Sequence, residues 1–277
     1  MFERGDVVYC YDGSFEGLLC CVFESYAQKE LPLDVTSLED GAPLLLPVRM
    51  VETDEERARR VLISIPQKIC PKALSLVKRG FLTCHPKKER LILNFLRLGF
   101  ATGAKVIQML ADETVHELNK AVQHLGGEAH LYTGFVRFSE ANGALSAQIE
   151  PKNFVLPLIA PHFAARLPRE NFLIHDKTHK MALIHKPGVM GIVPAEEYVM
   201  PRPGQEELRF RALWRLFYDT IEVEGRHNPR TRMGHMPKRY WRCMTEFARN
   251  DGALCDESAL LQTAKPAALM PPEHVEP

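Results

Sequence analysis

Residues 129–185 read AHLYTGFVRFSEANGALSAQIEPKNFVLPLIAPHFAARLPRENFLIHDKTHKMALIH. Runs of apolar and β-branched residues, bounded by turn residues, predict strands here, and Asn142-Gly143 is typical of a tight hairpin turn. The expected order is strand, strand, helix, strand, strand, over Ala129–Ser139, Ala144–Glu150, a helix at about 156–167, Phe172–Asp176 and Met181–His185. This order predicts a small antiparallel sheet with a helix on one face, and therefore an α+β fold.

The N-terminal segment begins with a predicted strand, Val7–Tyr11, and a predicted helix, Phe15–Gln28. Ser14 or Asp12 is expected to cap that helix, because short polar side chains accept hydrogen bonds from the free N–H groups of a first turn. Residues 30–47 are rich in proline and acids, which indicates a loop with short extended pieces.

A block of four predicted helices occupies residues 53–126, and a short strand is expected before it at Val48–Val51. The helices are expected from Thr53 to about Pro66 and near 71–82, 86–98 and 112–125. Gly99 is expected to end the third helix and Gly126-Gly127 the fourth, since glycine commonly follows the last helical residue.

The C-terminal part is predicted to be helical. Residues 200–205 are expected to be a linker, followed by a helix at about 206–223, a loop between Pro229 and Pro237, and a last helix at about 237–249. One face of the first of these helices is apolar and holds Phe210, Leu213, Trp214, Phe217 and Ile221. The predicted domains are therefore an α+β domain (1–199, with its sheet at 129–195), a helical region (200–261) and a disordered tail (262–277).

The composition is that of a globular protein: the 277 residues are 45% hydrophobic and 25% charged. No apolar run approaches the roughly 18 residues that a membrane span requires, and the start has no signal-peptide pattern, so a cytoplasmic location is expected. The seven cysteines are odd in number and have no Cys-x-x-Cys spacing, which predicts reduced thiols, no metal and no cofactor. Phosphate loops, dinucleotide fingerprints and common hydrolase motifs are missing from the sequence.

The charge is zero in total but uneven along the chain. Residues 1–56 carry 13 acids and 3 bases, residues 57–110 carry 12 bases and 1 acid, and residues 225–242 carry 6 bases and no acid. The two basic blocks predict a positive face that attracts a polyanion. The alternative is that the acidic segments fold back and neutralise them.

Two segments place a proline before two cations at an expected helix start: His85-Pro86-Lys87-Lys88 and Met236-Pro237-Lys238-Arg239. Cations are unfavourable there by about 0.3–1 kcal/mol each, unless an anion binds them together with the free N–H groups. We therefore expect phosphate contacts at both helix starts. The alternative is that exposed cations are tolerated and screened by salt.

The segment before Pro237 is also cationic, and it adds further expected nucleic-acid contacts at Arg226, Asn228, Arg230 and Arg232. Trp241 follows and is able in principle to stack on a base. Helical spacing places it on one face with Met244 and Phe247, which favours a core position instead.

Three residues of the sheet region are candidates for general acid or base chemistry: Glu128, His130 and Asp176. The competing interpretation is that these groups tie strands and turns together. His175 and His179 are four residues apart, but this spacing has no metal-binding meaning on strand-like backbone.

Several segments resemble one known family in their order: Tyr11–Leu19, Phe95–Phe100, Glu128–His130, Gly134–Phe138, Val155–Phe163, Ile174–Asp176, Leu213-Trp214, Arg226–Asn228 and Met236–Trp241. They resemble the bacterial family of domain of unknown function 4130, whose members are described as DNA metabolism proteins. The resemblance extends over about residues 9–247, nearly the whole chain. It carries over no catalytic residue.

The resemblance implies a DNA repair or DNA metabolism role beside a radical-SAM protein or a uracil-DNA glycosylase-like domain. Our first expectation is thus an accessory protein that binds DNA through its cationic residues. Two alternatives stay open: a nucleic-acid-processing enzyme that uses Glu128, His130 or Asp176, and an interaction scaffold without nucleic-acid contact.

Overall fold

The computed structural model describes residues 3–38, 46–141, 143–201, 203–220, 229–245 and 247. The chain divides into two compact units, which are described separately: unit 1 holds residues 1–132 and 151–161, and unit 2 holds residues 133–150 and 162–277. The boundary predicted at residue 199 falls inside unit 2. The predictions for Ile221, Arg226, Asn228 and the tail lie outside the described residues.

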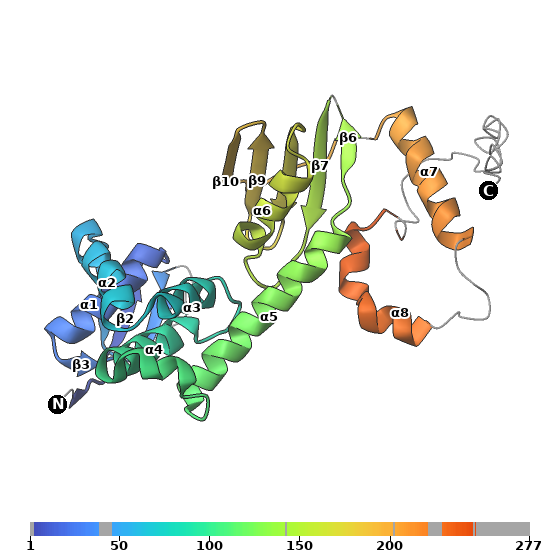
Figure 1. Ribbon diagram of the computed structural model, residues 1–277. Coiled ribbons are helices and arrows are strands. Elements are labelled where there is room, and N and C mark those ends of the chain that lie inside the picture. Colours follow the sequence, from blue (N-terminus) through green and yellow to red (C-terminus); the bar gives the residue numbers. More distant parts are fainter. Residues whose placement is uncertain are drawn as a thin grey trace, which may run out of the picture. The chain divides into compact units, whose positions relative to one another are not determined.

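Unit 1 is built on a three-stranded parallel sheet of order β4-β2-β5. Its central strand, β2, is labelled in Figure 1. Its strands are β2 (Val8–Tyr11), β4 (Asp34–Ser37) and β5 (Val48–Met50), and a separate parallel pair joins β1 (Glu3–Arg4) to β3 (Glu30–Leu31). All four residues of β2 are buried, as expected for a central parallel strand covered on both faces. The strand expected at residues 48–51 is present, and the predicted loop at 30–47 contains β3 and β4.

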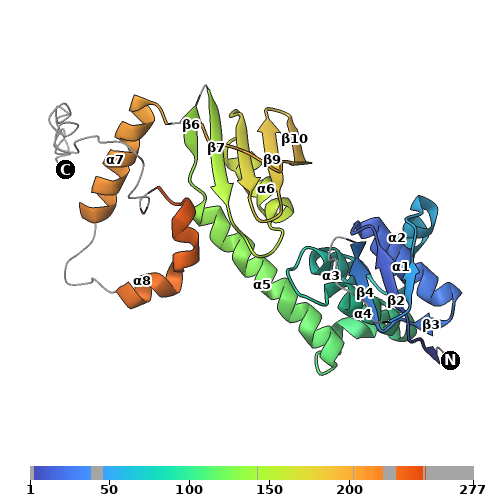
Figure 2. The ribbon, with the colours of Figure 1, turned by 180° about the vertical axis from the view of Figure 1, so that it is seen from behind.

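Helices gather around this short sheet in both views (Figures 1 and 2). They are α1 (Phe15–Ala27), α2 (Glu55–Lys68), α3 (Pro71–Phe81), α4 (Lys88–Thr102) and the 3₁₀ helix η2 (Gly103–Gln108). The long helix α5 (Glu113–Phe135) follows them in the chain, and its last residues belong to unit 2. The predicted cap of α1 is confirmed, because the Ser14 side chain accepts a hydrogen bond from the Gly17 N–H at 2.9 Å. Asp54 caps α2 in the same way.

Gly99 does not end α4, which continues to Thr102. A β-carbon at Gly99 would lie 2.7 Å from the Ile69 Cδ1 atom, closer than carbon atoms approach in proteins. This glycine therefore allows α4 to pack closely against Ile69. The prediction of a helix end was wrong because the same residue type serves both close packing and helix termination.

The helix predicted to stop at Gly126-Gly127 also continues, as α5, to Phe135. The residues from Ala129 to Phe135 are helical and not part of a strand, so the first half of the predicted hairpin was wrong. Buried residues recur every three or four positions on both sides of the glycines: Leu118, Ala121, Leu125, Glu128, Ala129 and Tyr132. That continuous buried stripe holds the helix together through the two glycines, which cost about 1 kcal/mol each.

Unit 2 contains a five-stranded sheet of order β10-β9-β8-β7-β6. The strands are β6 (Ser139–Ala141), β7 (Ala144–Ile149), β8 (Phe172–Asp176), β9 (Met181–Lys186) and β10 (Val189–Pro194). The predicted α+β fold is confirmed. The sheet is mixed, however, because β7 and β8 are parallel and are connected through α6 (Leu156–Arg166).

β10 was not expected from the sequence. It pairs antiparallel with β9 across a two-residue turn, Pro187-Gly188, in which Gly188 has φ 83°. A Pro-Gly pair is typical of a turn, so the sequence itself indicated this hairpin.

The C-terminal segments of unit 2 are α7 (Gln205–Thr220), α8 (Pro229–His235) and the 3₁₀ helix η4 (Lys238–Cys243). The predicted loop between Pro229 and Pro237 is thus a helix, and within the described residues the helix predicted at about 237–249 is a 3₁₀ segment that ends at Cys243. Pro237 precedes η4 in an extended conformation, with ψ 140°. Proline is the first helical residue at α8 instead.

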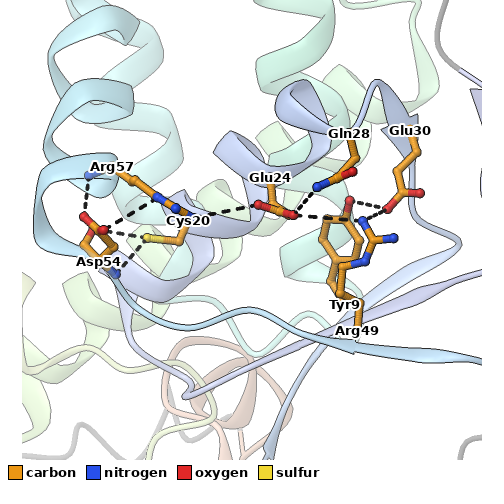
Figure 3. Close-up of polar contacts among 8 residues, drawn as sticks. All are labelled: Tyr9, Cys20, Glu24, Gln28, Glu30, Arg49, Asp54 and Arg57. Carbon is orange, nitrogen blue, oxygen red and sulfur yellow. Dashed lines mark hydrogen bonds and ion pairs between the residues drawn. The ribbon is translucent and has the colours of Figure 1, made fainter.

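Polar contacts connect the acidic N-terminal segment of unit 1 to nearby cations (Figure 3). Arg49 Nη1 lies 2.6 Å from Glu30 Oε1, to which the Tyr9 hydroxyl also donates. Arg57, at the start of the first basic block, lies 3.9 Å from Glu24 and 3.6 Å from Asp54. The acidic segment therefore pairs with its own Arg49 and with Arg57 of the first basic block. For Arg57, this is the alternative in which acidic segments neutralise the basic blocks.

Candidate functional site

A pocket in unit 2, the arginine pocket, gathers four cationic side chains around one carboxylate. It has a volume of about 430 Å³. The charged residues in its lining are Arg137, Lys177, Arg211, Arg242 and Glu150. They come from segments far apart in the chain, so the sheet and the C-terminal helices together create this concentration of positive charge.

Glu150 lies at the centre of the charge arrangement, directly after β7. Its Oε1 atom accepts a hydrogen bond from Lys177 Nζ at 2.7 Å, and its Oε2 atom lies 3.3 Å from Arg242 Nη1. Lys177 follows β8, the parallel neighbour of β7, so the sheet register places both residues at the same end of adjacent strands. One carboxylate is thereby shared between two cations, and the Arg242 side chain is still 77% exposed.

The other two arginines are held more firmly. Arg211 on α7 donates from Nε to Glu207 at 2.8 Å and also donates to the Ser139 hydroxyl. Arg137 donates to the Gly134 carbonyl at 2.8 Å. Even with Glu207 counted, cations outnumber carboxylates by four to two among the described residues of this site. Such an excess, ordered by hydrogen bonds, suits an anionic ligand.

η4 supplies one wall of the pocket and carries two of the predicted contact residues. Arg239 lies over the Tyr240 ring, 4.7 Å from its centroid, and Lys238 lies 5.9 Å from the Trp241 ring centroid. Tyr240 is buried against Phe135. Both cations are exposed, and neither Lys238 nor Arg239 lines the pocket.

The core position predicted for Trp241 from its spacing is confirmed in part. Its ring stacks on Phe247 with centroids 4.3 Å apart, and its Nε1–H donates to the Met236 carbonyl at 3.0 Å. It is partly and not fully buried. The ring thus stabilises η4, and Phe247 already covers one face of the indole.

Cys243 also lines the arginine pocket. Burial raises the pKa of its thiol, and the negative charge of Glu150 raises it further, while Lys177 and Arg242 act in the opposite sense. A raised pKa disfavours the thiolate at neutral pH, and the thiolate is the form that acts as a nucleophile.

Glu128 is a structural carboxylate of unit 1. It is 3% exposed on α5 and accepts hydrogen bonds from the N–H groups of Lys152 and Asn153 and from the Asn153 side chain. His130 follows on the same helix and is exposed. The bonds of Glu128 are those of a group that ties a turn to a helix.

Asp176 ends β8 in unit 2 and organises the turn that follows. The carboxylate is fully buried and accepts hydrogen bonds from the N–H groups of Thr178 and His179. It also contacts His179 Nδ1 at 2.7 Å. His175 Nε2 lies 3.0 Å from the Ala195 carbonyl, so the two histidines belong to different structural contacts.

The first predicted phosphate contact differs from the expected geometry. Pro86 lies in a turn, Lys87 is the residue before the first turn of α4, and Lys88 begins the helix. Lys87 is exposed, whereas Lys88 Nζ lies over the Phe81 ring and 3.9 Å from Glu89.

In unit 2, Arg230 is exposed on α8, and the Arg232 side chain is outside the described residues.

Sequence reasoning missed Lys177 and Arg211 altogether. Neither lies in a basic block, and their approach to Arg242 depends on sheet register and on the position of α7. Arg242 was counted in the second basic block but not singled out. No local signal in the sequence would have joined these residues.

The comparisons with known proteins give one match. The family model described as domain of unknown function (DUF4130) matches residues 86–246, which is more than half of the chain. No curated protein and no solved structure matches the chain significantly. Among the described helices, none combines the length and apolar character needed to cross a membrane.

Proposed function

Since this chain belongs to the DUF4130 family, we propose that it acts in DNA repair or DNA metabolism by binding the nucleic-acid backbone. The arginine pocket and the exposed cations of α8 and η4 make the contacts. In this proposal the protein is accessory to a partner of the radical-SAM or glycosylase type, as the family resemblance implies. The chemistry on the DNA then belongs to the partner.

The observation that carries the proposal is the charge of the arginine pocket. Arg137, Lys177, Arg211 and Arg242 converge there with a single carboxylate, Glu150, among the described lining residues. Guanidinium groups form bidentate hydrogen bonds with phosphate oxygens, and binding that displaces condensed counterions gains free energy. Arg230, Lys238 and Arg239 extend the positive charge along the described C-terminal segments.

The enzyme alternative has less support. The carboxylates of Glu128 and Asp176 are buried and already accept several hydrogen bonds from backbone N–H groups. A general base needs a lone pair directed at a substrate proton. These two groups direct theirs at the turns that they hold.

The test is fluorescence anisotropy with a labelled duplex and a labelled single strand over a range of salt concentrations. For the intact chain, log K falls linearly as log[salt] rises. The double variant Arg242→Gln/Lys177→Gln should bind more weakly, with a salt slope smaller by about 1 for each phosphate that the variant no longer neutralises.

The matched control is Arg166→Gln/Arg169→Gln, which removes the same charge from two exposed residues of unit 2 outside the pocket. It should retain nearly the wild-type slope. Binding that does not weaken with salt, or an equal loss of affinity in both double variants, contradicts the proposal. A Lys238→Ala/Arg239→Ala variant tests the η4 contacts separately.

A further inference from the structure

Besides the arginine pocket of unit 2, the protein has a polar cavity in unit 1, the sheet-end pocket, which the proposed function does not use. It has a volume of about 340 Å³ and lies where two parallel strands end. Tyr11 is the last residue of β2 and Ser37 is the last residue of β4, and both line it. Ligands of open parallel sheets bind outside the carboxyl ends of the strands, so this is the expected place for one.

The opposite wall comes from residues 83–89 and the first turn of α4. Glu89 is only 8% exposed, and its Oε1 atom accepts a hydrogen bond from the Tyr11 hydroxyl at 3.3 Å. Lys88 Nζ is 3.9 Å from the same oxygen. A carboxylate, a phenol and an ammonium group therefore line one small cavity, where desolvation strengthens their interactions with a ligand.

His85 adds a ring N–H to this set of groups. Its Nδ1 atom accepts the Lys87 N–H at 3.2 Å, which assigns the ring proton of neutral His85 to Nε2. His85 is one of the residues that line the pocket. With Lys88 it provides two donors for an anionic group on one wall, while Glu89 provides an acceptor.

This wall is held in place by hydrogen bonds to other parts of unit 1. The Cys84 N–H donates to Asn153 Oδ1 at 2.9 Å, and the Asn153 side chain donates in turn to Glu128 at 2.6 Å. The Phe154 N–H donates to the Leu82 carbonyl at 2.9 Å. Such a supporting network is typical of binding sites, where the lining groups must keep their positions before the ligand arrives.

From this arrangement we propose that the sheet-end pocket binds a small sugar phosphate. Lys88 and His85 bind the phosphate, and Glu89 accepts hydrogen bonds from sugar hydroxyls beside Ser37. The volume is within the range of small-molecule sites. The site is distinct from the arginine pocket and does not depend on the proposed backbone binding.

The lining favours a sugar over a nucleobase. Most of the accessible lining is polar. Within the part of the chain that the structure describes, the lining has one phenyl-type ring, Tyr11, and it is 1% exposed. A base needs an accessible flat surface on which to stack, and Tyr11 does not offer one.

The test is isothermal titration calorimetry of the full chain with ribose 5-phosphate, ribose and inorganic phosphate. Ribose 5-phosphate should bind at least about 10-fold more tightly than either fragment, because it uses both walls. Lys88→Met should weaken ribose 5-phosphate and phosphate alike by about 10-fold or more. Glu89→Gln should weaken ribose 5-phosphate without weakening phosphate, and Ser37→Ala serves if that variant fails to fold.

Lys87→Met is the matched control, because this cation is adjacent but does not line the pocket. It should leave binding unchanged, as should Arg242→Gln/Lys177→Gln, which separates this proposal from the previous one. Equal binding of ribose 5-phosphate and phosphate, or an equal effect of Lys87→Met and Lys88→Met, overturns the proposal.

A second readout uses Cys84, which is exposed and lines the pocket. Saturating ribose 5-phosphate should slow its alkylation at least about 3-fold, and unchanged alkylation counts against the site. An oligonucleotide ending in a 5′ abasic sugar phosphate distinguishes the two sources of this ligand. If the oligonucleotide displaces ribose 5-phosphate, the natural ligand is a strand end. If ribose 5-phosphate binds and the oligonucleotide does not displace it, the ligand is a free sugar phosphate.

Discussion

The buried carboxylate of Glu128 accepts two hydrogen bonds from Asn153, from the backbone N–H at 2.8 Å and from the side-chain amide at 2.6 Å. Residues 25 positions apart are thereby joined inside unit 1. Because Asn153 also accepts the Cys84 N–H, Glu128 acts on the sheet-end pocket through its support and without lining it.

We expect Glu128→Gln to lower the thermal stability of the protein. The amide keeps one acceptor oxygen but turns an NH₂ group toward buried donors, which costs about 1–3 kcal/mol and lowers Tm by about 3–10 °C. Differential scanning calorimetry measures the change. Glu117→Gln, an exposed change on the same helix, should leave Tm nearly unaltered. A fully stable Glu128→Gln protein would contradict the structural role.

Two glycine substitutions should have opposite effects on stability. A β-carbon at Gly17 would lie 2.3 Å from Asp12 Oδ1 and 2.8 Å from Thr53 Oγ1, so Gly17→Ala should destabilise by about 1–3 kcal/mol. At Gly126 no described atom lies within 4 Å of that position, and Gly126→Ala in the middle of α5 should stabilise by about 0.5–1 kcal/mol. Chemical denaturation of both variants checks the signs.

Asp12 should make stability depend on acid pH. Desolvation raises the pKa of its carboxyl, but hydrogen bonds from Ser14 and Thr53 outweigh it, and the folded pKa lies below the ordinary value of 3.8. The stabilisation is therefore complete above the unfolded pKa and is lost as pH falls through the folded pKa. The difference in unfolding free energy between wild type and Asp12→Asn should shrink below about pH 4.

Denaturation at pH 7, 5, 4 and 3 measures that dependence. Asp6→Asn, at an exposed carboxylate of the same segment, is the control and should show no comparable trend. A difference that grows on acidification would mean that the hydrogen bonds of Asp12 do not favour its charged form.

Thiol reactivity should rank the cysteines by their environment. Cys84 is exposed, whereas Cys10, Cys20 and Cys21 are buried, and burial raises the pKa of Cys21. Iodoacetamide at pH 7.5 should modify Cys84 first among these four, and the buried three only after unfolding. Peptide mass spectrometry resolves the sites. Modification of Cys21 in the folded protein at the rate of Cys84 would contradict the core described for unit 1.

Local patterns in the sequence predicted many of the elements. Of the two caps expected for α1, Ser14 and Asp12, Ser14 is the one observed, and α6, β8 and β9 lie within a residue or two of their expected bounds. These features depend on hydrogen bonds and side-chain spacing within a few residues, which a sequence displays directly. The Pro187-Gly188 turn was equally local and was overlooked.

Other outcomes depended on contacts between distant residues. Gly99 looks like a helix end until Ile69 is known to pack against it, and Gly126-Gly127 looks like another until the buried stripe of α5 is followed through it. The parallel pairing of β7 with β8 likewise follows from the path of the chain through α6 and not from the strand sequences.

The sequence by itself determined the helical and strand periodicity, the caps and the uneven charge of this protein, because each follows from covalent order and short-range hydrogen bonding. Only the tertiary structure decided which charges meet: Arg242 and Lys177 share Glu150, and Tyr11 donates to Glu89 across 78 positions. Electrostatic and hydrogen-bond energies depend on distance in space, and sheet register and helix packing set that distance.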